Sequence, residues 1–485
     1  MFKLRDYQEE ARYSVNAEMN QHRNPVFVSP TGTGKTKTAV AIIEDRIRLN
    51  GRVYVLVPQI EIFNQWVKDL SEAGLNPGMI KDGKVIGLNR SVYVVMPLTL
   101  INMLNHIKPS MYPTDIITDE CHHSEAVSWQ AIYDFFPNAV RLGLTATPKR
   151  TDGIPLANTY DCIVSTITMR TAIKKGFLAK PLCVVPEEFA CDVPIVGTDY
   201  DAKAQARSLG TPKIIGDVLD MYARAFVGKP CIVACCSFEH AKDMTEQFRA
   251  AGWNWEHLHS ELPADKRNEI IRKTREGKLN GLCTVGIGIE GMDIPGLYGL
   301  IWLRRTLSIT IYLQMVGRVL RPASDKPYGL IIDPVGNVFI HGFPEADRKW
   351  SLGEESGQTE EQIKVCPECG TVNSQNDTFC FACGASLEQE EKELAKGTRK
   401  RKLPSVEDGH LVIIGEEGIE EVDGKINEMK EKAEQQRIAE AEEVKAKQTR
   451  IISNTEKVQL FRQGILSPVN RENFRDAVKI LKGEV

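Results

Sequence analysis

The segment SPTGTGKT, residues Ser29–Thr36, has the composition of a loop that binds phosphate. It follows the apolar run VFV and precedes the amphipathic stretch TKTAVAIIEDRI, so the sequence predicts a strand, a glycine turn and a helix. Backbone N–H groups of such a turn can surround phosphate oxygens, and the helix N-terminus adds a favourable dipole. Lys35 can reach the β- and γ-phosphates, and the Thr36 hydroxyl can bind Mg²⁺. The expected nucleotide-contacting residues are Thr31, Gly32, Thr33, Gly34, Lys35 and Thr36.

The first position of this motif departs from its strict form, which has glycine where Ser29 stands. The plain alternative is a turn of glycine and threonine before a helix, without any ligand. The adjacent Lys35 and Thr36 stand at the positions that phosphate and Mg²⁺ require, so we favour phosphate binding.

Two adjacent carboxylates, Asp119 and Glu120, follow the apolar run in IITDECHH. Adjacent acids are usually surface charge, but these two end a predicted strand in a chain that also has a phosphate loop. In nucleotide hydrolases an Mg²⁺-holding Asp lies at such a strand tip. We therefore expect Asp119 to hold Mg²⁺ and Glu120 to orient or deprotonate the attacking water. Metal binding by Cys121, His122 and His123 is the alternative, although adjacent side chains do not converge easily on one ion.

A pair of arginines, Arg318 and Arg321, lies in the segment QMVGRVLRP, residues Gln314–Pro322. Residues three apart share one face of a helix. Two guanidinium groups on that face can enter the ATP site of a neighbouring domain and neutralise charge on the transferring phosphoryl group. Hydrolysis would then depend on closure of two domains. A basic helix flank without this role is the alternative. The expected catalytic residues are Lys35, Asp119, Glu120, Gln314, Arg318 and Arg321.

Four of the twelve cysteines form two CxxCG turns, CPECG at 366–370 and CFACG at 380–384. Each turn presents two thiolates, and its glycine lets the backbone fold beneath a metal ion. Four sulfur ligands make a closed tetrahedral site, so we expect a structural Zn²⁺ ion; a redox dithiol pair is the alternative. The expected ligands are Cys366, Cys369, Cys380 and Cys383.

The elements that must position these groups alternate β-rich apolar runs with amphipathic stretches over residues 1–345. This alternation is typical of βα units around parallel sheets. It restarts after a helical segment near Met169–Lys175, so we expect two consecutive α/β domains with a boundary between residues 150 and 225. The strand candidates are Val26–Val28, Val53–Val57, Val92–Met96, Ile116–Thr118 and Arg141–Thr145, then Cys231–Cys235, Trp255–His259, Leu282–Val285, Leu300–Leu303 and Leu330–Ile332.

The phosphate loop, the DECH segment and the later GLTATPKRTDG together resemble a superfamily 2 helicase of the DExH-box type, over roughly residues 2–345. The resemblance implies an ATP hydrolase with two tandem RecA-like domains of parallel sheets flanked by helices, over residues 1–165 and 166–350. The later segment IIDPVGNVFIHG, followed by RKWSL, is similar to the phage and bacterial branch that includes RadD-like and XPB-like helicases. That branch typically acts on DNA, so the resemblance favours DNA over RNA.

The resemblance also implies roles around the nucleotide. The segment LRDYQ resembles the adenine-reading Q motif, in which Gln8 would bond to the base and Arg5 would stack on it. Thr145 and Thr147 match the motif that links hydrolysis to domain movement, and His122 matches its partner in the DExH box.

Further segments match those that touch the nucleic-acid strand. IGIEGMDIP, residues Ile287–Pro295, resembles a segment whose glycine bend approaches both nucleotide and strand, with Gly291 and Asp293 as the informative residues. The segments that match strand-contacting loops are Val55–Trp66, Val94–Leu100, Cys236–Met244 and His257–Arg267.

Composition excludes some classes of protein. The net charge of -4 argues against a uniformly basic binder, although a local basic groove remains compatible with it. The longest apolar runs are far shorter than the roughly 20 residues of a membrane span, and the N-terminus MFKLRDYQEE lacks an apolar signal core. We expect a location in the cytosol or nucleoid of a bacterial host, with nucleic acid as partner and no membrane.

Beyond residue 350 the composition becomes more polar. We expect a zinc ribbon over 363–386 and a charged, mostly helical tail over 387–485, either of which could bind a protein partner. The run KGTRKRK at 396–402 could contact phosphates or form a solvated linker. Other functions stay open: a duplex translocase that never separates strands, an ATP-switched scaffold on nucleic acid, or the motor subunit of a nuclease complex.

Overall fold

A computed structural model describes the chain from residue 3 to residue 387, within one compact unit, Met1–Glu420. The residues left out of the description inside that range are 151–152, 186–192, 227–228, 286–296, 324–325, 327, 354–355, 358, 360–362, 367–370, 376 and 381–383.

The first part of the chain forms an eight-stranded sheet with the order β4-β3-β5-β2-β6-β7-β1-β8. Its neighbouring strands are parallel, except that β4 runs antiparallel to β3. Every residue of β1, β2, β5 and β6 is buried, as expected for parallel strands covered on both faces. The strands are β1 Pro25–Val28, β2 Val53–Leu56, β3 Gly78–Lys81, β4 Lys84–Ile86, β5 Val92–Val95, β6 Asp115–Asp119, β7 Val140–Thr145 and β8 Cys162–Val164.

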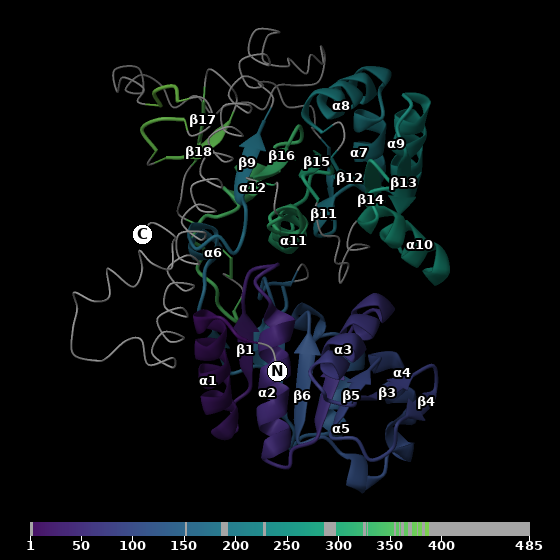
Figure 1. Cartoon of the computed structure of the whole chain (residues 1–485), viewed down its shortest axis with the longest axis vertical. Helices are drawn as coiled ribbons and strands as arrows, with labels where there is room; N and C mark the ends of the chain where they lie inside the picture. Colours follow the sequence, from purple (N-terminus) through teal and green to yellow (C-terminus); the bar gives the residue numbers. More distant parts are fainter. Residues whose placement is uncertain are drawn as a thin grey trace, which may run out of the picture. The chain divides into compact units, whose positions relative to one another are not determined.

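Helices cover both faces of this sheet (Figure 1). Val53 and Val55 of β2 pack in one apolar cluster with α1, α2 and α3, whereas Tyr54 and Leu56 pack in another with α4 and α5. This alternation follows from the two-residue period of a strand. The helices are α1 Asp6–Asn20, α2 Lys35–Arg48, α3 Ile60–Glu72, α4 Pro97–Met103 and α5 Val127–Phe135, with 3₁₀ turns at Leu104–His106, Pro109–Met111, Cys121–His123 and Leu156–Asn158.

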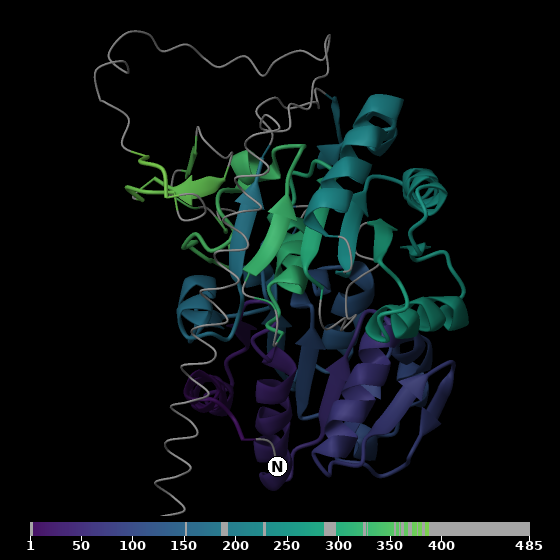
Figure 2. The same ribbon diagram turned by 45° about the horizontal axis from the view of Figure 1, so that its top comes forward.

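A second sheet of six parallel strands has the order β13-β14-β12-β15-β16-β9. Its edge strand β9 comes first in the sequence but lies beside β16, which comes last (Figure 2). The strands are β9 Lys180–Val184, β12 Cys231–Cys235, β13 Trp255–Leu258, β14 Gly281–Val285, β15 Gly299–Leu303 and β16 Tyr328–Ile332. The helices of this part are α6 Met169–Lys174, α7 Ala202–Leu209, α8 Pro212–Ala225, α9 Phe238–Ala250, α10 Ala264–Arg275, α11 Ile309–Val319 and α12 Asn337–His341.

After α12 the chain returns to the first sheet through the described residues of 349–353 and 356–357, here called the return segment. The carbonyl of Leu352 accepts a hydrogen bond from Ala157 N at 3.1 Å, and the Ser356 hydroxyl donates to the carbonyl of Pro148 at 3.0 Å. Trp350 and Leu352 pack against the apolar cluster of Val26, Val28, Cys121, Leu156 and Tyr160. The first RecA-like domain is therefore attached to the second at two places along the chain.

Two antiparallel hairpins complete the described elements. The first, β10 Ile195–Val196 with β11 Asp199–Tyr200, lies between β9 and α7 in the sequence. The second, β17 Ile363–Val365 with β18 Val372–Ser374, belongs to the cysteine-bearing region, and Thr371 bridges to Val184 of β9. The cysteine-bearing hairpin thus adjoins the edge of the second sheet.

The predicted architecture of two tandem RecA-like domains is confirmed, because each expected strand lies in one of two parallel-dominated sheets. Sequence reasoning did not predict β9, whose Pro181 suits an edge position. Within the described residues, every helix is too short or too polar to cross a membrane.

Candidate functional site

The phosphate loop joins β1 to α2, which begins at Lys35, so the N-terminus of α2 faces the loop. Gly32 and Gly34 have φ angles of +87° and +86°, in the left-handed region that only glycine adopts without strain. A Cβ atom on Gly34 would lie 2.6 Å from the amide nitrogen of Gln8. Glycine is therefore required here both for backbone conformation and for space.

Ser29, at the position where the strict motif has glycine, has a structural role. Its hydroxyl lies 2.6 Å from that of Thr33, which also donates to the carbonyl of Pro30 at 2.6 Å. The backbone N–H of Ser29 donates to the carbonyl of Thr145 at 3.2 Å. The serine thus cross-links the loop internally and lies where the loop bonds to β7.

The residues of the predicted Q motif contact the phosphate loop directly. Gln8 donates from its amide nitrogen to the carbonyls of Thr33 and Gly34, at 3.1 and 3.3 Å. Tyr7, which sequence reasoning missed, donates its hydroxyl to Thr33 O at 2.5 Å. The Arg5 guanidinium lies 4.2 Å above the ring centre of Phe177. Contacts of Gln8 and Arg5 with adenine stay predictions.

Asp119 lies at the carboxyl end of β6, with both carboxylate oxygens hydrogen-bonded. One oxygen accepts from Glu120 N at 3.0 Å, and the other accepts from the indole N–H of Trp66 at 2.7 Å. Burial and the charge of Glu120 raise the pKa of the Asp119 carboxyl, while Trp66 and Lys35 act in the opposite direction. Lys35, Asp119 and Glu120 therefore interact electrostatically within one site.

Glu120 has a strained backbone, with φ +48° and ψ +55° in the left-handed region. Such strain is concentrated at functional sites, where the surrounding structure enforces it. Its carboxylate lies 3.5 Å from His122 Nδ1 and accepts a hydrogen bond from the Gln314 amide at 3.4 Å. Gln314 belongs to α11 of the second domain, so the two domains meet at the expected water-orienting carboxylate.

Thr145 and Thr147, which were expected to couple hydrolysis to movement, are both fully buried. The backbone N–H of Thr147 donates to the Thr145 hydroxyl at 3.1 Å. The loop that follows contacts the second domain, because Thr310 of α11 donates its hydroxyl to Lys149 O at 3.0 Å. Arg150 in the same loop donates to the carbonyl of His122 at 2.6 Å. This loop therefore touches both the DECH segment and the arginine-bearing helix.

Helix α11 carries Arg318 and packs against the phosphate loop, whereas Arg321 lies two residues beyond the end of the helix at Val319. The prediction that both arginines share one helix face is therefore wrong for Arg321, because the helix ends before it. A Cβ atom on Gly317 would lie only 2.5 Å from that of Thr31, and one on Gly32 would lie 3.4 Å from Arg321 Cγ. Arg318 is buried, and burial lowers the pKa of Arg321 to about 10, which leaves it charged at neutral pH. The fold thus places a buried cation next to the loop that is expected to hold phosphate.

The loop before α11 is held by residues that sequence reasoning missed. Asp199 of the β10–β11 hairpin accepts hydrogen bonds from Leu307 N at 2.7 Å and from the Thr306 hydroxyl at 2.8 Å. Asn337 of α12 accepts from Thr306 N at 2.9 Å and donates to Arg304 O at 2.8 Å. Because these contacts link distant segments, no local sequence signal predicts them.

A second contact between the domains joins α3 to α10. Arg267 donates two hydrogen bonds to one carboxylate oxygen of Glu61, at 2.6 and 2.8 Å. The two side chains are 17% and 15% exposed, so the pair is shielded more than a surface ion pair. Both residues lie in segments that resemble strand-contacting loops.

The alternative metal site at Cys121, His122 and His123 does not fit the position of Cys121. The sulfur faces the core, where a Cβ atom on Gly143 would lie 2.8 Å from it. Burial raises the pKa of the Cys121 thiol well above its usual value, which keeps the thiol neutral. Cys121 is a core residue.

Half of the expected zinc site is described. Cys366 and Cys380 are buried, and the amide of Asn373 lies 3.7 Å from the Cys380 sulfur. Gly384, with φ +72°, donates its N–H to the carbonyl of Cys380 at 2.8 Å. Other predicted residues lie outside the described part of the chain: Cys369, Cys383, Gly291 and Asp293.

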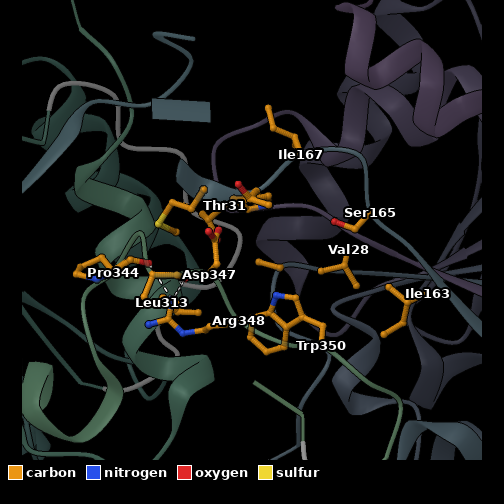
Figure 3. A pocket seen from close by; sticks show the side chains of 15 residues that line it. Val28, Thr31, Ile163, Ser165, Ile167, Leu313, Pro344, Asp347, Arg348 and Trp350 are labelled. Atoms are coloured by element: carbon orange, nitrogen blue, oxygen red, sulfur yellow. Dashed lines mark hydrogen bonds between the residues drawn. The ribbon is translucent and has the colours of Figure 1, made fainter. Parts of the chain in front are cut away.

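A pocket of about 410 Å³ lies beside the phosphate loop (Figure 3). One wall includes Thr31 and another includes Trp350 of the return segment, whose ring packs near Val28. The described residues that line it are Val28, Pro30, Thr31, Ala146, Ile163, Ser165, Ile167, Thr168, Met169, Leu313, Pro344, Ala346, Asp347, Arg348 and Trp350.

Comparison with known families divides the chain in the same way as the fold does. Residues 1–150 match the family described as Type III restriction enzyme, res subunit, and residues 214–323 match the helicase conserved C-terminal domain. Residues 365–387 match a zinc-ribbon domain.

Similar proteins occur in viruses and archaea. A 51.5 kDa protein of a Lactococcus phage is 30% identical over 371 residues, which cover 75% of this chain and 78% of that protein. Putative helicase 22 of a Sulfolobus islandicus filamentous virus is 24% identical, with coverage of 69% and 65%. The DNA 3'-5' translocase XPB2 of Sulfurisphaera tokodaii is 30% identical over 175 residues, 36% of each chain. This chain therefore spans less than two thirds of the length of these last two relatives.

The fold is also that of a solved fragment of a putative HsdR subunit of a type I restriction enzyme from Vibrio vulnificus, with a TM-score of 0.57 and 21% identity. The match covers 73% of this chain and 67% of that fragment.

A phosphate loop on one parallel sheet, packed against an arginine-bearing helix from a second, defines an ATP hydrolase built from two RecA-like domains. The matches to both helicase domains and to the phage protein make the affiliation specific. The chain belongs to the superfamily 2 helicases.

Proposed function

We propose that this helicase couples ATP hydrolysis to movement along a nucleic-acid strand, and that the strand is DNA rather than RNA. The contact between Gln314 and Glu120 is the main support, because it makes the water-orienting carboxylate depend on the second domain. The similarity to a protein named as a DNA 3'-5' translocase supports DNA.

In the proposed cycle, ATP binding closes the two domains. The backbone of the phosphate loop and Lys35 hold the phosphates, and Glu120 orients the attacking water. Arg318 and Arg321 neutralise the charge that develops on the transferring phosphoryl group. Mg²⁺, when bound at Thr36 and Asp119, would screen the phosphate charges. Loss of the γ-phosphate removes the anion that both arginines contact, so the domains separate again.

The composite site is tested by ATPase assays on Lys35→Ala and Arg318→Ala. Both variants should lose nucleic-acid-stimulated hydrolysis, whereas a control in a surface ion pair, Glu269→Gln, should retain it, because its carboxylate is 39% exposed. Intact stimulated activity in either site variant would contradict the composite site.

The preference for DNA over RNA is tested by comparing single-stranded DNA, duplex DNA, forked DNA and RNA as activators of ATP hydrolysis at matched salt. Matched salt is essential because phosphate contacts make binding strongly salt-dependent. We expect DNA to stimulate hydrolysis most. Stronger stimulation by RNA would reject the DNA assignment. Strand displacement on forks, compared with displacement of a third strand from a triplex, separates a helicase from a translocase that leaves the duplex paired.

We further propose that the ribbon holds one structural Zn²⁺ ion through Cys366, Cys369, Cys380 and Cys383. The burial of Cys366 and Cys380 and the amide of Asn373 near the Cys380 sulfur fit a site of this kind, in which amide groups near a sulfur stabilise its thiolate form. Metal analysis of the purified protein should find about one zinc per chain. A content near zero would refute the proposal, and Cys366→Ser should lower the content while Cys162→Ser, outside the ribbon, leaves it unchanged.

The remaining organisation is also a proposal. We propose that the chain consists of RecA-like domains over 1–165 and 166–350, a ribbon over 363–386 and a tail over 387–485. Limited proteolysis should then cut first after the ribbon. A protein that acts on DNA is expected in the cytosol or nucleoid, and co-purification with the host nucleoid would test this location. We also propose that the ribbon or the tail binds a protein partner, which would be recovered in the same co-purification.

A further inference from the structure

We propose that Trp66 is a positioning residue that fixes the carboxylate of Asp119 for the divalent cation. The indole N–H of Trp66 donates to one oxygen of Asp119 at 2.7 Å, and this hydrogen bond is buried. The inference rests on the proposed role of Asp119 in holding Mg²⁺, and it assigns to Trp66 a function beyond that of a core residue.

The position of Trp66 is itself fixed by packing. Trp66 is 1% exposed and lies on the apolar face of α3 with Ile62, Phe63 and Leu70. Residues three or four apart share a helix face, so these four side chains form one stripe toward the sheet. The indole ring belongs to the same apolar cluster as β2 and β6 and cannot turn away without opening the core. The indole N–H of Trp66 is therefore held pointing toward the carboxylate of Asp119.

The chemistry of an indole suits this task. Its nitrogen is a donor only and carries no charge, so it compensates a buried carboxylate without competing as a ligand for the cation. Asp119 is 9% exposed, and its second oxygen accepts the N–H of Glu120. Each oxygen uses one acceptor position for the protein and keeps another for a cation or its bound water. A carboxylate held in this way, together with the hydroxyl of Thr36 expected to bind Mg²⁺, supplies the hard oxygen ligands that Mg²⁺ prefers.

A matched control exists in the second domain. Trp302 is fully buried in β15, and its indole nitrogen has no hydrogen-bond partner among the described residues. Trp66→Phe and Trp302→Phe therefore remove the same atoms from two buried sites, but only the first removes a hydrogen bond to Asp119. Any effect of lost ring volume should appear in both variants.

The test measures cation binding directly. Mn²⁺ binding to the complex of the full-length protein with ADP is followed by electron paramagnetic resonance, with thermal unfolding of each variant alongside. Loss of such an outer contact typically weakens metal affinity about 10- to 100-fold, so we expect at least about tenfold weaker Mn²⁺ binding in Trp66→Phe. Trp302→Phe should bind Mn²⁺ like the unaltered protein, and ADP affinity in EDTA should be the same in both variants.

In ATPase assays Trp66→Phe should raise the half-saturating Mg²⁺ concentration and leave kcat at saturating Mg²⁺ within a few-fold. A role limited to core packing would lower stability without moving the half-saturating concentration. Unchanged Mn²⁺ affinity in Trp66→Phe, or equal weakening in both tryptophan variants, would overturn the inference.

Asp119→Ala separates this inference from the proposed function. If that variant binds Mn²⁺ normally, the assignment of Asp119 itself fails. If Asp119→Ala weakens binding and Trp66→Phe does not, only the role of Trp66 fails.

A second measurement does not depend on the folding of Trp66→Phe. The chain has six tryptophans, and ¹⁵N-indole labelling gives one N–H resonance for each. Asp119→Ala should shift one resonance strongly upfield, because its hydrogen bond to a carboxylate is lost. Six unchanged resonances would overturn the inference.

Discussion

The two RecA-like domains contribute to the ATP site in different ways. In the first domain the expected reactive groups lie at the ends of β6 and β7 and at the start of α2, and contacts within the domain hold them, as Trp66 holds Asp119. In the second domain they lie on helix α11 and, for Arg321, just beyond its end, and the loop before the helix is fixed by Asp199 and Asn337 from distant segments. The first arrangement builds a binding site from several segments of one domain. The second makes one rigid group that moves as a unit, which suits a domain that activates hydrolysis.

The largest expected effect is on kcat, when an arginine of the second domain is removed. Arg318→Ala should lower kcat about 10³- to 10⁵-fold, the range typical of an arginine that stabilises phosphoryl transfer. ATP affinity, measured with a fluorescent nucleotide, should change only a few-fold, whereas Lys35→Ala should lose binding as well. If both variants lose binding equally, the division into a binding domain and an activating domain is wrong.

Glu120→Gln should lower kcat about 10²- to 10⁴-fold, because it removes the group that orients or deprotonates water. ATP binding should be retained, since Gln314 can still bond to the new amide. Single-turnover hydrolysis separates the chemical step from product release. The control Glu72→Gln alters a carboxylate that is 51% exposed on α3 and should behave like the unaltered protein.

The contact between Glu61 and Arg267 tests whether domain closure also runs through α3. Either Glu61→Ala or Arg267→Ala should lower nucleic-acid-stimulated kcat about five-fold, which corresponds to roughly 1 kcal/mol of coupling. The double variant should be no worse than the single ones, because both remove the same ion pair. Additive losses would mean that the two residues act separately, for instance on the strand itself.

The smallest expected effect concerns the internal cross-link of the phosphate loop. Ser29→Ala removes one buried hydrogen bond, worth about 1 kcal/mol, and should lower the Tm of the first domain by about 2–4 °C. Ser71→Ala, which removes an exposed helical hydroxyl, should leave Tm nearly unchanged. ATP affinity should stay nearly unchanged in Ser29→Ala, and a large loss of ATP affinity would mean that the serine contacts nucleotide.

Local patterns predicted the parts of the fold that are locally determined. The apolar runs gave the central strands of both sheets, since a buried parallel strand is a short apolar run between turns. The same reasoning missed β9, where Pro181 interrupts the pattern and the strand pairs with β16 from far along the chain. It also missed the β10–β11 hairpin, whose two-residue strands are too short for any periodicity.

The candidate site shows the same limit. Lys35 and Asp119 could be predicted because a short motif contains all the signal. Trp66 was named only as the end of a possible strand-contacting segment, because nothing in the sequence shows that its N–H reaches β6. The roles of Gly291 and Asp293 stay predictions, since both lie outside the described residues.

The return segment changes how the two domains can move. The chain crosses between them once ahead of β9 and again after α12, where Leu352 and Ser356 bond to the first domain. Two bodies joined at one point can swivel about three axes, whereas two bodies joined at two separate points keep mainly rotation about the line through both. While these bonds hold, ATP-driven closure should therefore be mainly a rotation about the axis through the two connections. The ribbon starts just beyond the second connection, so it lies near this axis and should be displaced little in each cycle.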